Sequence, residues 1–249
     1  MRKVEVIPLT GLPEVSTGAD LAALILDAVR RARLRIMDRD VVVVKQKAVS
    51  KAEGRLVGLA TVRPGRKARL MAKAQGKDPR LVELILRESV RVVRAGHGVI
   101  ITETRHGYVC ANSGVDQSNV RPGYVALLPI DPDRSASRIR KELQKATGRE
   151  VAVVISDTFG RPWRKGQTDV AIGSSGISPL NSYAGAKDPY GYELRVTEPA
   201  LVDEVASAAE LATGKLRGIP AAIVRGVDYQ KSEVGVRSLV MERSRDLFR

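Results

Sequence analysis

Valine- and isoleucine-rich segments recur along the chain and predict β-strands. Some alternate apolar with polar residues, and others are continuously apolar, as is typical of strands buried on both faces. Residues 41–44 are four consecutive valines and predict a central strand. The pattern predicts strands over 4–8, 40–44, 99–103, 107–112, 124–129, 151–156, 168–173 and 219–225.

Other segments carry apolar residues three or four positions apart, which predicts helices. Asp20 is suited to cap the first helix, and Gly148 to end the fourth. The predicted helices cover 21–33, 66–74, 79–94, 135–147 and 198–212.

Composition narrows the class of protein. A chain of 249 residues suits one large domain or two small ones, and 43% hydrophobic residues are enough to build a core. The single cysteine, Cys110, excludes an intrachain disulfide, and with only two histidines a His/Cys zinc cluster is excluded as well. Any metal must then be held mainly by oxygen atoms, which favours Mg²⁺ or Mn²⁺.

No apolar run approaches the ~20 residues of a membrane span, so we expect a cytoplasmic protein without membrane contact.

The formal net charge of +14 has two interpretations. One is a nucleic-acid-binding protein, and the other is an enzyme for polyanionic small molecules with further cations on its surface. The basic residues are spread over the whole length, and aromatic residues make up only 4%, without the interleaved aromatic and basic strand that stacks bases. Nucleic acid is therefore the less favoured partner.

The most informative stretch is 153–167, where an apolar run changes abruptly to polar residues after Ser156. We interpret the change as the end of a buried strand, with the Asp157 carboxylate projecting into a cleft and 159–167 forming a long hairpin loop. The alternative is a strand followed by a plain polar turn that Asp157 stabilises.

Three further stretches carry candidate chemistry. Lys45, Lys47 and Lys51 follow the valine strand and could neutralise phosphates, although a solvated charge run is the commoner case. Asp116 and Asn119 lie in a polar loop and offer a hard oxygen ligand and an amide, unless that loop only satisfies its own backbone. Residues 173–191 suggest a lid or a dimer contact.

Three motifs together resemble one known family. They are SKAEGR at 50–55, NSGVDQSNV at 112–120 and SDTFGR at 156–161, preceded by GLP at 11–13 and followed by GIP at 218–220. In this order they resemble the coenzyme F-420:L-glutamate ligase (F-420-0:gamma-glutamyl ligase) family, over essentially the entire chain. The segments around Trp163, 166–169 and 188–191 are most similar to its bacterial form, without the C-terminal nitroreductase-like domain.

The resemblance implies an α+β fold in one ligase domain spanning 1–249, with two lobes of mixed and antiparallel sheets, flanking helices and an intertwined homodimer. It implies a GTP-dependent ligase that adds L-glutamate residues through gamma-linkages to F-420-0. Activation of a carboxylate as an acyl phosphate suits such a reaction, because metal ions and cations can hold the phosphates in line.

The resemblance also implies roles for individual residues. Asp116 and Asp157 would be catalytic as metal ligands for Mg²⁺ or Mn²⁺. Beyond the resemblance, we hypothesise that Arg161 acts in catalysis with Arg164 and Lys165 by binding the acceptor or glutamate, unless these residues are surface cations. Thr158 would be a further metal ligand. The implied guanine-nucleotide positions are Thr10, Gly11, Leu12, Pro13, Gln46, Lys47, Lys51, Asn119, Thr213, Gly214 and Ile219.

The chain departs from the family pattern at one position. Some relatives carry an acidic ligand of a second metal in the loop after the last helix, where this chain has Lys215. A charged lysine cannot ligate Mg²⁺, so the second metal would have fewer protein ligands, or Lys215 would contact phosphate. Two other functions stay open: a ligase of the same architecture for another carboxylated cofactor precursor, and a basic nucleic-acid-binding protein.

Overall fold

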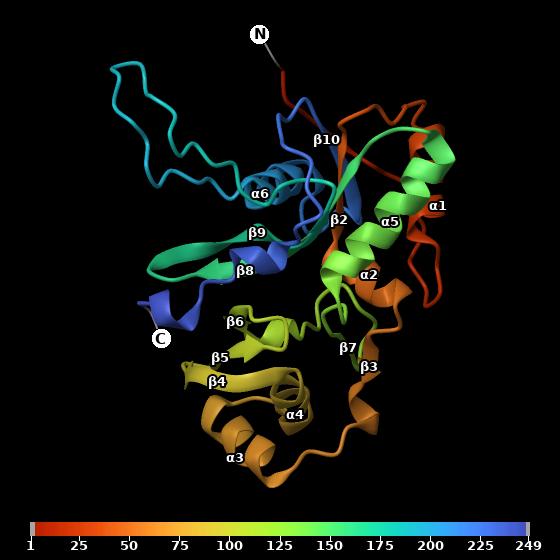
Figure 1. The fold of residues 1–249 in the computed structure, drawn as a ribbon. Helices are drawn as coiled ribbons and strands as arrows, with labels where there is room; N and C mark the ends of the chain where they lie inside the picture. The colour runs from red at the N-terminus through yellow and green to blue at the C-terminus, as the bar shows by residue number, and fades with distance from the viewer. Residues whose placement is uncertain (1–2, 248–249) are drawn as a thin grey trace.

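A mixed five-stranded sheet forms the centre of the larger part of the molecule. The computed structural model describes residues 3–247. The third and fourth strands along this sheet, β2 and β8, are parallel, and the other neighbouring pairs are antiparallel (Figure 1). The strands lie in the order β1 (Glu5–Pro8), β10 (Ala221–Arg225), β2 (Val41–Lys45), β8 (Ala152–Arg161) and β9 (Arg164–Ser175).

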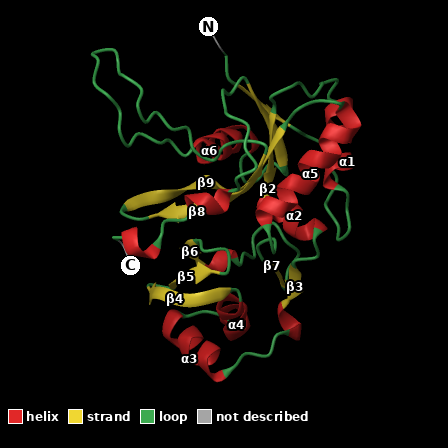
Figure 2. Ribbon diagram, in the orientation of Figure 1, coloured by secondary structure: helices red, strands yellow, loops and turns green. Residues whose placement is uncertain are grey.

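Both faces of this sheet are buried where its central strands pair, because residues 41–44 of β2 and 152–155 of β8 are all apolar and buried. Successive side chains of a strand point to opposite faces. Val42 and Val44 accordingly pack with α1 and α5, whereas Val41 and Val43 pack with α6. Figure 2 shows α1 and α5 on one side of the sheet and α6 on the other. The helices of this part are α1 (Leu21–Arg31), α2 (Gln46–Ala52), α5 (Pro132–Thr147) and α6 (Leu201–Thr213).

Residues 56–126 form a smaller body with its own cluster of buried residues. It lies below the large sheet in Figure 1. Its strands are β3 (Leu56–Gly58) paired with β7 (Tyr124–Ala126), and β4 (Ser89–Gly96), β5 (Val99–Thr104) and β6 (Val109–Ala111) in a second sheet. Its helices are α3 (Arg66–Gln75) and α4 (Pro79–Arg87), and short 3-10 turns occur here and near the C-terminus at Leu59–Thr61, Asn112–Gly114, Val236–Leu239 and Arg243–Arg245.

The structure confirms an α+β fold with mixed and antiparallel sheets. The intertwined homodimer and the single-domain boundaries stay predictions. Within the described residues, no helix is long and apolar enough to cross a membrane.

One predicted helix is half wrong. The helix expected over 79–94 ends at Arg87, and Ser89–Gly96 is strand β4, paired antiparallel with β5. The valines at 90, 92 and 93 are β-branched and favour a strand once a partner is present. Arg91 also finds its ionic partner across the ladder, since its Nε donates to Glu103 at 2.7 Å. These pairings are not local, so helical spacing alone misassigned the segment.

The expected strand end at Ser156 is also wrong. β8 continues to Arg161 and pairs with β9 as far as Arg161 opposite Arg164, so most of 159–167 is a paired hairpin rather than a long loop. Asp157 and Thr158 therefore lie on a strand, opposite Val170 and Asp169. The polar residues fit a strand because the hairpin extends beyond the sheet, where its outer residues are exposed.

A bulge in this hairpin joins the two bodies. Ile155 pairs with Gly173 but Ser156 pairs with Ala171, which leaves Ile172 as an extra residue on β9. The Tyr108 hydroxyl donates to the Ile172 carbonyl oxygen at 2.5 Å. The smaller body is thus hydrogen-bonded to the strand pair beside Asp157.

The close approach of β9 to α5 gives a test of the fold. A Cβ at Gly173 would lie 2.5 Å from the carbonyl carbon and oxygen of Pro132. We expect Gly173→Ala to lower the free energy of unfolding by about 1–3 kcal/mol, because the backbone must shift. Gly160→Ala on β8 is the control, since nothing lies within 4 Å of its Cβ position. Urea unfolding of both variants measures this loss of stability. Equal unfolding midpoints would contradict the close packing of β9 against α5.

Candidate functional site

A cavity of about 340 Å³ lies beside the carboxyl end of β2 and the middle of β8, where the parallel pairing of the two strands ends. The carboxyl ends of parallel strands are the usual place for a ligand in an open sheet. β2 contributes Lys45, and β8 contributes Ser156, Asp157 and Thr158. Many of the predicted nucleotide positions line it: Leu12, Pro13, Gln46, Lys47, Lys51, Asn119, Gly214 and Ile219.

Some predicted positions lie elsewhere. Thr10 and Gly11 precede the lining segment and are exposed, and the buried Thr213 hydroxyl donates to the Ala209 carbonyl within α6. Arg161 lies at the exposed end of the hairpin, where its guanidinium donates to the Lys165 carbonyl oxygen at 3.3 Å. Gln46 lines the cavity, but its amide nitrogen donates to Ser50 Oγ and to the Leu127 carbonyl. Its packing role is therefore evident, and its nucleotide role stays a prediction.

Asp116 reaches the cavity through Lys47. The Lys47 Nζ donates to Asp116 Oδ2 at 2.5 Å and to Ser118 Oγ at 2.8 Å. Although burial acts in the opposite direction, hydrogen bonds from Lys47 and Ser118 lower the pKa of Asp116. Asp116 is therefore ionised, and it is already paired with the ammonium group of Lys47.

Asp157 has the opposite electrostatic balance. Burial raises its pKa to about 7, and the negative charges of Asp116 and Asp169 add to the increase, against the backbone N–H of Thr158 and the charge of Lys47. A carboxyl group whose neighbours are other carboxylates gains from a divalent cation placed among them.

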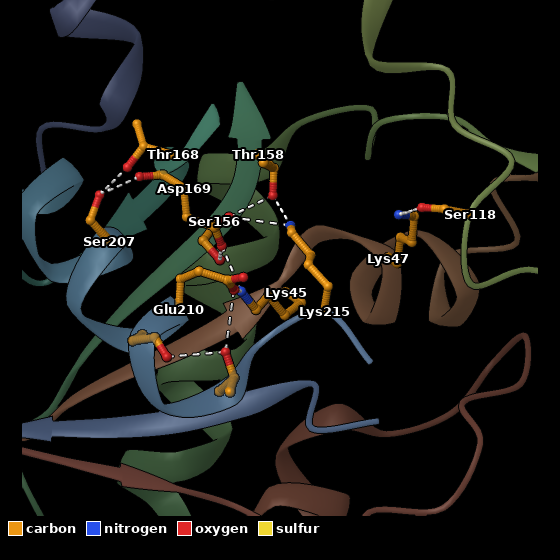
Figure 3. A network of polar contacts seen from close by, with 12 residues as sticks. Lys45, Lys47, Ser118, Ser156, Thr158, Thr168, Asp169, Ser207, Glu210 and Lys215 are labelled. Atoms are coloured by element: carbon orange, nitrogen blue, oxygen red, sulfur yellow. Dashed lines mark hydrogen bonds and ion pairs between the residues drawn. The ribbon is translucent and has the colours of Figure 1, made fainter. Parts of the chain in front are cut away.

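The structure adds a central residue that the motifs did not indicate, Asp169 on β9 (Figure 3). Its side chain is fully buried. Oδ2 accepts from Lys45 Nζ at 2.6 Å and from Ser156 Oγ at 3.1 Å. Oδ1 accepts from Thr158 Oγ1 at 2.5 Å, and Lys215 Nζ lies 3.4 Å from it. Despite burial, these hydrogen bonds and charges hold the pKa of Asp169 below its usual range.

Two lysines on separate elements are gathered around this carboxylate. Lys45 also contacts the Glu210 carboxylate of α6. Lys215 comes from the loop after α6 and donates to the Thr158 hydroxyl oxygen. The hydroxyl that was expected to ligate a metal is thus hydrogen-bonded to an ammonium group. Lys51 in turn lies 2.5 Å from Glu14.

Sequence reasoning missed Asp169 and Glu210, although one signal was available. Asp169 is a charged residue at the start of an apolar strand, and such residues are almost never fully buried unless they are paired. Its partners lie 124 and 46 residues away along the chain, so only the fold reveals them.

No group of three or more His, Cys, Asp or Glu side chains within residues 3–247 is arranged as a metal site. One Mg²⁺ or Mn²⁺ at Asp116 and Asp157 stays a prediction. The donor type suits it, because Mg²⁺ is commonly held by one or two carboxylates together with substrate phosphates. The like-charge effect of Asp116 on the pKa of Asp157 indicates that the two carboxylates share one electrostatic environment.

Comparisons with known proteins agree on one family. The family model for F420-0:Gamma-glutamyl ligase matches residues 11–226. The coenzyme F420:L-glutamate ligase of Methanothermobacter thermautotrophicus is 45% identical over 249 residues, which are 99% of each chain. That of Methanopyrus kandleri is 45% identical over 99% of this chain and 97% of its own, and that of Methanocaldococcus jannaschii 44% identical over 100% and 98%.

The raised pKa of Asp157 predicts a dependence of stability on pH. The folded state binds the Asp157 proton more tightly than the unfolded chain, where the pKa is about 3.9. Burial of this group therefore costs nothing below pH ~4, and the cost grows as the pH rises through about 7. We expect Asp157→Asn to be more stable than wild type at pH 8, by on the order of a few kcal/mol, and equally stable at pH 4.

Urea unfolding without divalent ions or nucleotide measures this difference. Glu142→Gln, which removes an exposed carboxylate of α5, is the control for loss of one negative charge. A constant difference between Asp157→Asn and wild type from pH 4 to pH 8 would show that Asp157 is not the titrating group.

Proposed function

This chain belongs to the F420-0:gamma-glutamyl ligase family, and from that membership we propose that it adds L-glutamate through gamma-linkages to F-420-0 in a reaction driven by GTP. The relatives named above are coenzyme F420:L-glutamate ligases, and they match this chain from end to end. Their activity is the one we assign to it.

The observation that best supports this proposal is the charge of the cavity. Four lysines line it, Lys45, Lys47, Lys51 and Lys215, and each is held by a carboxylate or a hydroxyl oxygen. Ammonium groups in a partly buried cleft suit a triphosphate, whose charge they neutralise at a fixed place. Lys47 and Lys51 are the groups that we assign to the phosphates.

Asp116 and Asp157 are the residues that would hold Mg²⁺ or Mn²⁺. When bound, such an ion would supply positive charge that neutralises the phosphates of the nucleotide. Asp116 would contribute a carboxylate that is already ionised, and the raised pKa of Asp157 means that a bound cation would favour its ionised form.

The substrates suggest the remaining steps. Transfer of the phosphoryl group to the carboxylate of the acceptor forms an acyl phosphate, and the amine of glutamate displaces phosphate to form the amide. The protein needs only to orient the reactants and screen their charge. We assign Arg161, Arg164 and Lys165 to anionic groups of the acceptor or of glutamate, because they cluster at the exposed end of the hairpin that carries Asp157.

A second copy of this chain is the partner that we propose. The segment between β9 and α6 extends away from the molecule in Figure 1, and it exposes Tyr190 at 97% and Tyr192 at 68%. An extended arm with exposed aromatic side chains fits a contact between protomers better than a solvated loop.

Two alternative functions are distinguished by the assay described below. A ligase of the same architecture could use another carboxylated cofactor precursor. A basic nucleic-acid-binding protein would instead bind duplex or single-stranded nucleic acid in a salt-sensitive way that survives Asp157→Asn.

The decisive assay combines the protein with GTP, Mn²⁺, L-glutamate and F-420-0. We expect release of GDP together with a mass gain of glutamyl units on the acceptor. Asp157→Asn and Asp116→Asn should each reduce kcat by about 100-fold or more, because charge on the phosphates is no longer neutralised in the transition state. Glu142→Gln should retain wild-type turnover. GDP release without glutamylated product would overturn the assignment of the acceptor.

A further inference from the structure

The Thr158 side of the cavity holds an ammonium group of the chain itself. Lys215 lies on the loop that begins at Gly214, where a backbone φ of +60° ends α6. Its Nζ donates to Thr158 Oγ1 and lies 3.4 Å from Asp169 Oδ1. The same loop is fixed to the polar loop of the smaller body, since Asn119 Nδ2 donates to the Lys215 carbonyl oxygen at 3.5 Å.

Asp169 has no remaining capacity to ligate a metal. A carboxylate offers about four lone-pair positions on its two oxygens. Lys45 and Ser156 occupy those of Oδ2, and Thr158 and Lys215 occupy those of Oδ1. The side chain is fully buried, so these four donors account for the space around its two oxygens.

Thr158 likewise has little capacity left to ligate a metal. Its hydroxyl hydrogen is donated to Asp169, and its oxygen accepts from Lys215. One lone pair remains, and a divalent ion placed on it would meet the ammonium charge beside it. The donor set on this side therefore does not fit a second Mg²⁺ or Mn²⁺.

The charges around Asp169 are already balanced. Lys45 and Lys215 carry two positive charges, and Asp169 and Glu210 carry two negative charges in contact with them. A metal ion would add two uncompensated charges to a partly buried cluster, at a high cost in solvation.

We propose that Lys215 is a tethered cation of the nucleotide site, positioned by Asp169, which takes the place of a second divalent ion. The chain then binds one divalent ion, between Asp116 and Asp157, and Lys215 supplies the other positive charge to the phosphates. This inference rests on the proposed use of a nucleoside triphosphate. Lys215 is half exposed, so its ammonium group is available to a ligand in the cavity.

The first test counts metal ions. Mn²⁺ binding is followed by electron paramagnetic resonance, with and without a non-hydrolysable GTP analogue. We expect wild type to bind one Mn²⁺ per chain and Lys215→Glu to bind two, because a carboxylate oxygen replaces the ammonium group. Lys73→Glu, an exposed change of the same charge on α3, should bind one. Two Mn²⁺ in wild type, or one in Lys215→Glu, would overturn the proposal.

The second test separates positioning from structure. Asp169→Asn removes the charge that holds Lys45 and Lys215, and Lys215→Met removes the ammonium group. We expect each to weaken binding of the GTP analogue roughly tenfold, and to raise KM for GTP more than it lowers kcat. Asp203→Asn is the control, because Asp203 is partly buried and, among the described residues, its carboxylate accepts only from the Ala171 backbone N–H. Equal weakening in the control would mean that Asp169 is merely structural.

These outcomes are distinct from those of the ligase assay. The Mn²⁺ count needs neither F-420-0 nor glutamate. One Mn²⁺ without ligation would refute the proposed activity alone, and ligation with two Mn²⁺ would refute the tethered cation alone.

Discussion

A buried carboxylate controls the arrangement of the site. Removing an ionised group from water is costly unless it is paired and hydrogen-bonded, and Asp169 meets this requirement with two ammonium groups and two hydroxyls. Those donors come from β2, β8 and the loop after α6. One charge thus determines where three separate elements meet.

The backbone makes this meeting possible. Parallel pairing places Lys45 beside Ser156, and the antiparallel hairpin places Thr158 opposite Asp169. A bulge at Ile172 separates the well-packed part of that hairpin from the part that carries the polar groups. The hydrogen bond from Tyr108 to Ile172 then links the smaller body, which contributes Asp116, to the same strands. Sheet register and the contact between the two bodies, rather than sequence proximity, bring Asp116 and Asp157 into one electrostatic environment.

The ionised form of Asp157, which would bind a metal ion, is the form that burial in the folded protein disfavours. Its pKa is raised because burial and neighbouring negative charges disfavour the ionised form. Asp169 is also removed from solvent but has a lowered pKa, because hydrogen bonds from Lys45 and Thr158 outweigh its burial. The two acids therefore differ in role. Asp169 is neutralised within the protein by lysines, and Asp157 is the acid that we propose a bound ion neutralises.

Much of the fold followed from local pattern. The valine strand, the capped helices and the hairpin over 99–112 are encoded in periodicity and in capping or turn residues, which act within a few positions. The error over 79–94 arose where a strand depends on a distant partner, and the error over 159–167 arose because a paired hairpin with polar ends reads as a loop.

The motifs also indicated where the candidate site lies, since Lys47, Lys51, Asp157 and Thr158 line one cavity. Asp169, Glu210 and the contact of Lys215 with Thr158 lay beyond sequence reasoning. The sequence by itself determined the family, the elements and the acids and lysines available to a polyanionic ligand. Only the tertiary structure decided which of them meet, because pairing between charges depends on distance in space, which strand register and helix packing set.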